Sequence, residues 1–178
     1  MSLVSCVFAW HSTGHITVGR IAELHLQQTG QQKIVDWVNG ILQPFTKVCG
    51  EDKWPFAECA TWPDKVKEQG YWMMAGWHFT DQRYYKPGYI PPPEKHIVLQ
   101  SQNITWAIKN CAGNLISNST DTQGKSDSIL MKSISMRNLI HFVGDIHQPL
   151  HTTGRFSAEL PDGDMGGNLF PIKHYSNP

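Results

Sequence analysis

The segment HFVGDIHQPLH, residues 141–151, carries three histidines and one aspartate. His141 and Asp145 are four residues apart, so on a helix their side chains lie on one face, one turn apart. An imidazole and a carboxylate placed in this way can bind one zinc ion through bonds of about 2.0–2.2 Å. Pro149 ends such a helix, which lets His151 reach back over the same face. The two oxygens of Asp145 can bridge two metals, which lie about 3.5–4 Å apart in multi-metal hydrolases. A helix-capping and salt-bridging cluster is the alternative.

Three other segments supply further candidate ligands. AWHSTGH ends in His15, ATWPD ends in Asp64, and WHFTD contains His78 and Asp81. Trp10 lies five residues before His15. Each of these residues taken alone is more often structural, and a histidine flanked by aromatic residues is usually a packed one. Together with the first segment they provide histidine and aspartate ligands from several parts of the chain, as multi-metal sites generally do.

These residues need elements that bring them together, and the spacing of the apolar residues predicts helices. The predicted helices cover residues 14–28, 31–42, 94–116 and 128–146. Residues 46–93 are rich in Trp, Pro, Gly and Tyr, and we expect a long ordered loop region with short helical turns there. No alternating strand pattern persists for long, and the tail from residue 152 is expected to be loop-like. The sequence therefore predicts an all-α domain.

Length and composition are those of one ordinary domain. The chain has 178 residues, of which 40% are hydrophobic, and this is enough for a core. Fifteen basic and fifteen acidic residues give a formal net charge of zero, which argues against a basic groove as the main source of nucleic-acid affinity. A polyanionic substrate would then be held by local charge, and bound metal ions are an obvious source. No segment reads as a membrane span.

Several features agree with secretion. The first nine residues, MSLVSCVFA, resemble the end of a signal peptide, although a basic n-region is missing. Glycosylation sequons begin at Asn103 and Asn118. Three cysteines lie further along the chain: Cys49, Cys59 and Cys111. An odd count leaves one thiol without a partner, and Cys49 and Cys59 are candidates for a disulfide bridge that spacing alone does not fix.

Five motifs occur in a fixed order along the chain. They are W-x4-H from Trp10, A-x-W-x-D ending at Asp64, H-F-x-D from His78, H-F-x-G-D-x-x-Q-P-L-H from His141, and D-x-G-G-N ending at Asn168. In this order they resemble the zinc-dependent single-strand nuclease family of the mung bean nuclease type, to which zinc phospholipase C is distantly related. The resemblance implies an all-α fold of that type. Residues 1–9 would be a signal-peptide remnant, and residues 10–178 a zinc-dependent nuclease domain that is incomplete at its C-terminus.

The resemblance also implies a cluster of three zinc ions at the base of a cleft. The first zinc would be bound by four side chains: Asp64, His78, His141 and Asp145. The second would be bound by the α-amino group and carbonyl oxygen of Trp10, by His15 and by Asp145. The third would be bound by His151 together with a histidine and an aspartate of a later L-H-x3-D segment.

Further roles follow from the same resemblance. Asp64 would be catalytic as well as a ligand, and Lys67 and Asn168 would be catalytic and bind near the phosphate. Phe79 would stack on a nucleobase, and Asp81 would hydrogen-bond to it. The implied reaction is metal-assisted hydrolysis of single-stranded RNA and DNA to products with a 5′ phosphate, with 3′-nucleotidase activity as a further expectation. We expect a monomer that is secreted or lysosomal, with no membrane attachment in its mature form.

The chain departs from the family pattern in two places. His11 stands where the family has a small residue. After HYSNP the family continues with its L-H-x3-D segment and further helices, so we expect two zinc ions to bind tightly and the third weakly. The alternatives are an inactive remnant that binds zinc, and a zinc phospholipase C. The latter has a wider spacing between its N-terminal tryptophan and first histidine, which favours the nuclease.

Overall fold

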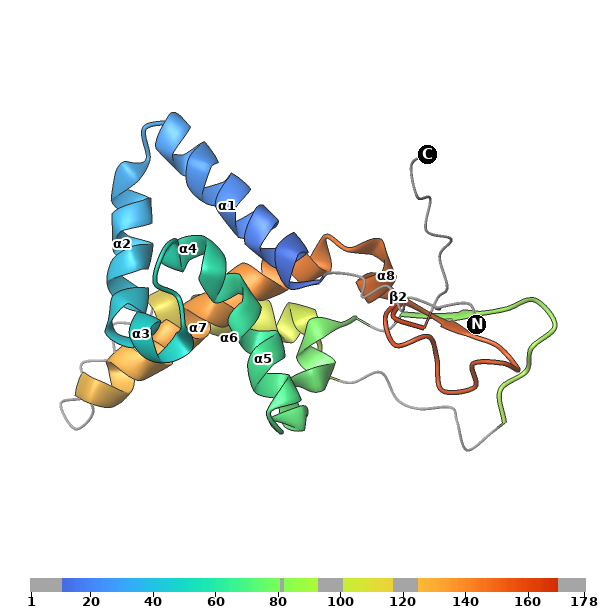
Figure 1. Ribbon diagram of the computed structural model, residues 1–178. Coiled ribbons are helices and arrows are strands. Elements are labelled where there is room, and N and C mark those ends of the chain that lie inside the picture. Colours follow the sequence, from blue (N-terminus) through green and yellow to red (C-terminus); the bar gives the residue numbers. More distant parts are fainter. Residues whose placement is uncertain (1–10, 81, 93–100, 117–124, 170–178) are drawn as a thin grey trace, which may run out of the picture.

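The N-terminal part of the chain is a helical hairpin (Figure 1). The computed structural model describes residues 11–80, 82–92, 101–116 and 125–169. Helices α1 (Ser12–Gln28) and α2 (Gln32–Leu42) are joined at Gly30, which has a φ of 75°. Glycine adopts this left-handed conformation readily because it lacks a Cβ, and such a residue commonly ends a helix. The prediction of both helices is confirmed.

Short helices fill the region between α2 and residue 80. In chain order they are η1 (Gln43–Phe45), α3 (Thr46–Cys49), α4 (Pro55–Glu58), η2 (Cys59–Thr61), α5 (Trp62–Glu68) and η3 (Trp72–His78). Prolines occupy the first turn of η1, α4 and α5, where a helix does not need the missing N–H. The expectation of a long ordered region with short helical turns is confirmed for residues 46–80, and prolines begin two of its helices, α4 and α5.

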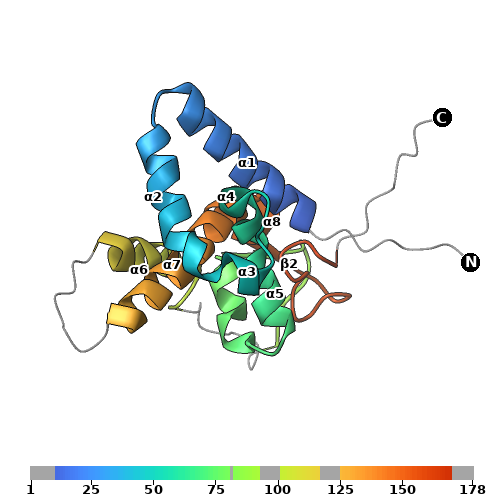
Figure 2. The same cartoon turned by 60° about the vertical axis from the view of Figure 1, so that its left-hand side comes forward.

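The central element is α7 (Lys125–Ile146), which packs against α1, α2, α5 and η2 and most extensively against α6 (Ile104–Ile116). Figures 1 and 2 show α7 running through the helical body. One apolar cluster lies where α2, α4, α6 and α7 meet, and its buried members are Val35, Val38, Leu42, Phe56, Cys59, Leu115 and Met136. The predicted helix over 128–146 is confirmed. The predicted helix over 94–116 is confirmed from Ile104 onward, whereas residues 101–103 form a bend and residues 93–100 lie outside the described part.

A small parallel sheet lies beside α8 (Pro149–Thr152), next to the C-terminal end of α7 (Figure 1). Strand β1 (Gln82–Tyr85) pairs with β2 (Thr153–Phe156), with Gln82 opposite Thr153 and Tyr85 opposite Phe156. The prediction of a loop after residue 152 was wrong at β2. Four-residue strands give too short a pattern to be recognised in sequence. The prediction of an all-α fold holds for the helical body, to which this sheet is an appendage.

A buried ion pair joins α7 to the segment after α3. The guanidinium of Arg137 donates from Nε to Glu51 Oε1 at 2.8 Å and from Nη2 to Glu51 Oε2 at 2.5 Å. Its Nη1 also donates to the carbonyl and hydroxyl of Ser133. Both charged residues are only 1% exposed. Since each charge is satisfied by the other, neither can be removed without leaving its partner buried alone.

The other sequence-based expectations concern thiols, sequons and membranes. Cys49, Cys59 and Cys111 are free, so the candidate bridge between Cys49 and Cys59 is not formed. Asn103 caps α6, because its Oδ1 accepts a hydrogen bond from Trp106 N–H at 3.2 Å. Residues 1–10 and Asn118 lie outside the described part. Within the described part, no helix combines the length and apolar character needed to cross a membrane.

Candidate metal centre

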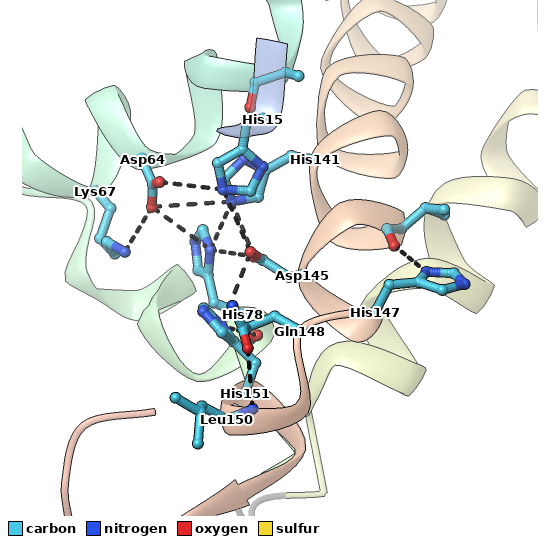
Figure 3. A network of polar contacts seen from close by, with 12 residues as sticks. His15, Asp64, Lys67, His78, His141, Asp145, His147, Gln148, Leu150 and His151 are labelled. Atoms are coloured by element: carbon cyan, nitrogen blue, oxygen red, sulfur yellow. Dashed lines mark hydrogen bonds and ion pairs between the residues drawn. The ribbon is translucent and has the colours of Figure 1, made fainter. Parts of the chain in front are cut away.

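Side chains from five elements converge at one end of α7, as Figure 3 shows. They are His15 of α1, Asp64 of α5, His78 of η3, His141 and Asp145 of α7, and His151 of α8. The histidines and Asp145 are buried, whereas Asp64 is partly exposed. The third histidine of the 141–151 segment, His147, points away from this group, and its ring N–H donates to the carbonyl of Val143 at 2.6 Å.

The two carboxylate oxygens of Asp145 face different histidines. Oδ2 lies 2.9 Å from His141 Nε2 and 3.0 Å from His78 Nδ1. Oδ1 lies 3.4 Å from His15 Nε2 and 3.8 Å from His151 Nδ1. Oδ1 is buried and has no hydrogen-bond partner. Asp145 therefore separates two groups of ligand atoms in the way that a bridging carboxylate does.

Asp64 approaches the same centre from the opposite side. Its Oδ1 lies 3.7 Å from His78 Nδ1 and 3.9 Å from His141 Nε2, and its Oδ2 lies 3.7 Å from His15 Nε2. Lys67, one turn further along α5, donates to Asp64 Oδ1 at 2.7 Å. The short helix thus places one carboxylate and one ammonium group at the edge of the centre.

The donor set fits a divalent metal ion. Four atoms bound tetrahedrally to one zinc lie about 3.3 Å from one another, because each bond is about 2.0–2.1 Å long. His78 Nδ1 and His141 Nε2 lie 2.9 Å from each other, 3.0 and 2.9 Å from Asp145 Oδ2, and 3.7 and 3.9 Å from Asp64 Oδ1. The Nδ1–H of His141 donates to the carbonyl of Ala60 at 2.6 Å, which orients Nε2 toward the centre. Ligand atoms of His15, His141 and Asp145 also lie within 4.8 Å of one another.

The protonation of the centre follows from burial and charge. Burial lowers the pKa of His15 to about 4, with His141 adding to the effect, and burial likewise lowers the pKa of His78 to about 4. Burial also opposes a charge on His141, but Asp145, Asp64 and the carbonyl of Ala60 together outweigh it and raise the pKa of His141. Burial of Asp145 is in turn outweighed by His141 and His78, which hold the pKa of Asp145 well below its usual range. Of these three histidines, His141 is therefore the one that keeps a proton to the highest pH when no metal is bound.

His151 and Phe79 form a stacked pair beside the centre. Their ring centroids are 4.7 Å apart and their planes differ by 14°. The Nδ1–H of His151 donates to the carbonyl of His78 at 3.3 Å, and the N–H of Thr80 donates to the carbonyl of His151 at 2.9 Å. His151 Nε2 is buried without a hydrogen-bond partner. One side-chain and one main-chain hydrogen bond thus join the segments that carry His78 and His151.

The structure brings together eight of the site residues expected from the sequence: His15, Asp64, Lys67, His78, Phe79, His141, Asp145 and His151. Trp10 and Asp81 lie outside the described residues. Asn168 is half-buried in the loop after β2, where its N–H donates to the carbonyl of Met165 at 3.3 Å. The sequence did not indicate the role of Ala60, which orients His141 through a main-chain carbonyl. No side-chain pattern reports such a contact.

A helical body with a buried centre of histidines and aspartates that can bind metal is the class of protein that the sequence motifs predicted. The chain belongs to the S1/P1 nuclease family, whose model matches residues 10–177. It is 29% identical to Endonuclease 4 of Arabidopsis thaliana, over 97% of this chain and 52% of the relative. It is 26% identical to Endonuclease 5 of the same plant, over 98% of this chain and 54% of the relative. The chain thus spans about half the length of these curated relatives. No solved structure matches it significantly.

Zinc binding should release a proton from His141. Because its pKa is raised, His141 keeps a proton at pH values where an ordinary histidine has lost it, and zinc must displace that proton to bind Nε2. We expect about one proton per chain to be released at pH 6, and zinc affinity to fall as the pH falls through the pKa of His141. Calorimetric titration in two buffers of different ionisation enthalpy measures this release. His25→Gln, which alters an exposed histidine of α1, should leave it unchanged. Equal apparent enthalpies in both buffers would show that the centre holds no such proton.

Proposed function

We propose that this chain is a zinc-dependent endonuclease that hydrolyses phosphodiester bonds of single-stranded RNA and DNA and leaves 5′ phosphates. The observation that carries the proposal is the position of Asp145, whose two oxygens face separate groups of ligand atoms. Membership of the S1/P1 nuclease family and similarity to plant proteins named endonucleases support it.

Two zinc positions are proposed on either side of Asp145. One would use Asp64, His78, His141 and Asp145 Oδ2, and the other His15, Asp145 Oδ1 and the α-amino group and carbonyl of Trp10. A zinc pair of this kind supplies a water of lowered pKa as a nucleophile near neutral pH and neutralises charge on the phosphate. His151, with an unpaired Nε2 pointing into buried space, is proposed as a ligand of a third zinc.

The remaining proposed residues bind and orient the substrate. Lys67 is held by Asp64 at the edge of the centre, where its ammonium group can attract a phosphate oxygen. Asn168 can donate its side-chain amide to the same phosphate. Phe79 can stack on an unpaired base. A base inside a duplex is already stacked and paired, so this contact would give the proposed preference for single strands. Asp81 would hydrogen-bond to that base.

The cleavage assay compares a single-stranded oligonucleotide with the same sequence in a duplex. We expect cleavage of the single strand only, loss of activity with a chelator, recovery with zinc, and product ends that carry a 5′ phosphate. Lys67→Gln should lower kcat/KM by about tenfold or more through loss of a charge-assisted contact. Its matched control is Lys65→Gln, an exposed lysine on the same helix, which should have no effect.

The alternatives predict other results in this assay. An inactive remnant would bind zinc without cleaving any oligonucleotide, and a zinc phospholipase C would hydrolyse phosphatidylcholine instead. Hydrolysis of a 3′-nucleotide in the same buffer tests the proposed 3′-nucleotidase activity. We further propose a secreted or lysosomal monomer. Gel filtration with light scattering tests the oligomeric state, and deglycosylation of the cell-expressed protein tests passage through the secretory pathway.

A further inference from the structure

The loop formed by residues 163–168 packs its main chain directly onto the candidate site. Gly166 and Gly167 are buried, and they have φ values of 66° and 85°. A Cβ atom added to Gly166 would lie 2.2 Å from Phe79 Cε1 and 2.7 Å from Phe79 Cδ1. One added to Gly167 would lie 2.6 Å from Leu150 Cδ1 and 2.7 Å from Leu150 Cβ. These separations are far below van der Waals contact, so only glycine fits at either position.

Phe79 and Leu150, the residues that Gly166 and Gly167 contact, are both neighbours of His151. Phe79 stacks on the imidazole of His151 with ring centroids 4.7 Å apart. Leu150 is the preceding residue on α8, a four-residue helix that lacks the rigidity of a long one. The loop therefore contacts one partner of the stack directly and the other through its neighbour.

We propose that Gly166 and Gly167 are positioning residues, which hold the Phe79–His151 pair in register with the rest of the centre. This inference rests on the proposed function, in which Phe79 receives a base and His151 binds metal. The glycines touch neither substrate nor metal in this account. They set the distance between the main chain of the loop and two neighbours, the Phe79 ring and Leu150 of α8. Asn168 follows directly after Gly167 in the same turn.

The test compares Gly166→Ala with Gly88→Ala in the full chain. Gly88 has a φ of 83° and nothing within 4 Å of an added Cβ, so it carries the same backbone strain without the contact. The first readout is the imidazole NMR signal of His151 in the zinc-free chain, assigned with His151→Asn. We expect Gly166→Ala to shift this signal, because the ring current of Phe79 changes, and Gly88→Ala to leave it in place. The second readout is cleavage of a single-stranded oligonucleotide, where Gly166→Ala should lower kcat/KM by about a hundredfold, as a misplacement of about 1 Å can.

A second variant, Gly166→Ala combined with Phe79→Leu, removes the ring atoms that the added methyl group would meet. If Gly166→Ala fails to fold and the double variant folds, the ring contact is the reason for the glycine. If neither folds while Gly88→Ala does, or if the His151 signal is the same in Gly166→Ala and Gly88→Ala, the proposal is overturned. The NMR readout needs no catalysis, so failure of the unaltered chain to cleave nucleic acid would count against the proposed function and not against this inference.

Discussion

Asp145→Asn should strip zinc from both proposed positions at once. An amide is neutral and cannot share its two ends between metals as a carboxylate does, and both oxygens of Asp145 face ligand histidines. Loss of a partner outside the ligand shell already costs about 10- to 100-fold in metal affinity, so loss of a shared ligand should cost more than about 100-fold. Zinc per chain, measured by mass spectrometry after dialysis, should fall to background, and oligonucleotide cleavage with it.

The matched control is Asp36→Asn on α2. Asp36 is exposed and accepts a hydrogen bond from Gln32 Nε2 at 2.8 Å, far from any candidate ligand in sequence. The Asp36→Asn variant should retain the zinc content and activity of the parent chain. Circular dichroism of both variants shows whether each remains helical. If a helical Asp145→Asn bound as much zinc as Asp36→Asn, the bridging role of Asp145 would be wrong.

Arg137→Leu should destabilise the chain by about 3–5 kcal/mol, because it leaves Glu51 buried without its partner. Burial already raises the pKa of Glu51, against the opposing effect of Arg137. Without the guanidinium of Arg137, the carboxylate of Glu51 must either take up a proton or be hydrated by water that enters the core. Urea unfolding of the zinc-free chain, followed by circular dichroism, measures the loss as a lower midpoint with an unchanged slope.

Two comparisons separate this effect from ordinary loss of charge. Lys86→Gln breaks the exposed pair between Lys86 and Glu159, which are 3.4 Å apart, and should leave the midpoint nearly unchanged. Combining Glu51→Leu with Arg137→Met removes both charges, and this variant should be more stable than Arg137→Leu. An unfolding midpoint for Arg137→Leu equal to that of the parent would mean that Glu51 finds another partner or reaches water.

Part of the centre could be predicted because it depends on helix periodicity. His141 and Asp145 are neighbours on any α-helix, and α7 places them on one face with 2.9 Å between Nε2 and Oδ2. The positions of His15 and Asp64 depended on motif order instead, since no local rule brings α1 and α5 to the end of α7. Family resemblance supplied what spacing alone could not.

The contacts that orient the ligands could not be predicted, because they are made by main-chain atoms. Ala60 accepts from His141, and the carbonyl of His78 accepts from His151, but neither contact depends on the identity of the residue that offers the carbonyl. The bounds of the short helices between residues 43 and 63 could not be predicted for a different reason. Proline disfavours the interior of a helix and favours its first turn, so its presence alone does not separate loops from short helices.

The pairing of β1 with β2 has a consequence for how the molecule is made. His78 and His151 are 73 residues apart, yet the imidazole of His151 contacts the carbonyl of His78, and the main-chain bond from Thr80 to His151 lies next to this parallel ladder. Contacts between distant segments form late in folding, because a long stretch of chain must be ordered before they close. All of α7 is synthesised before His151 can join the other candidate ligands. During synthesis the candidate centre therefore lacks its last histidine until α8 has been made.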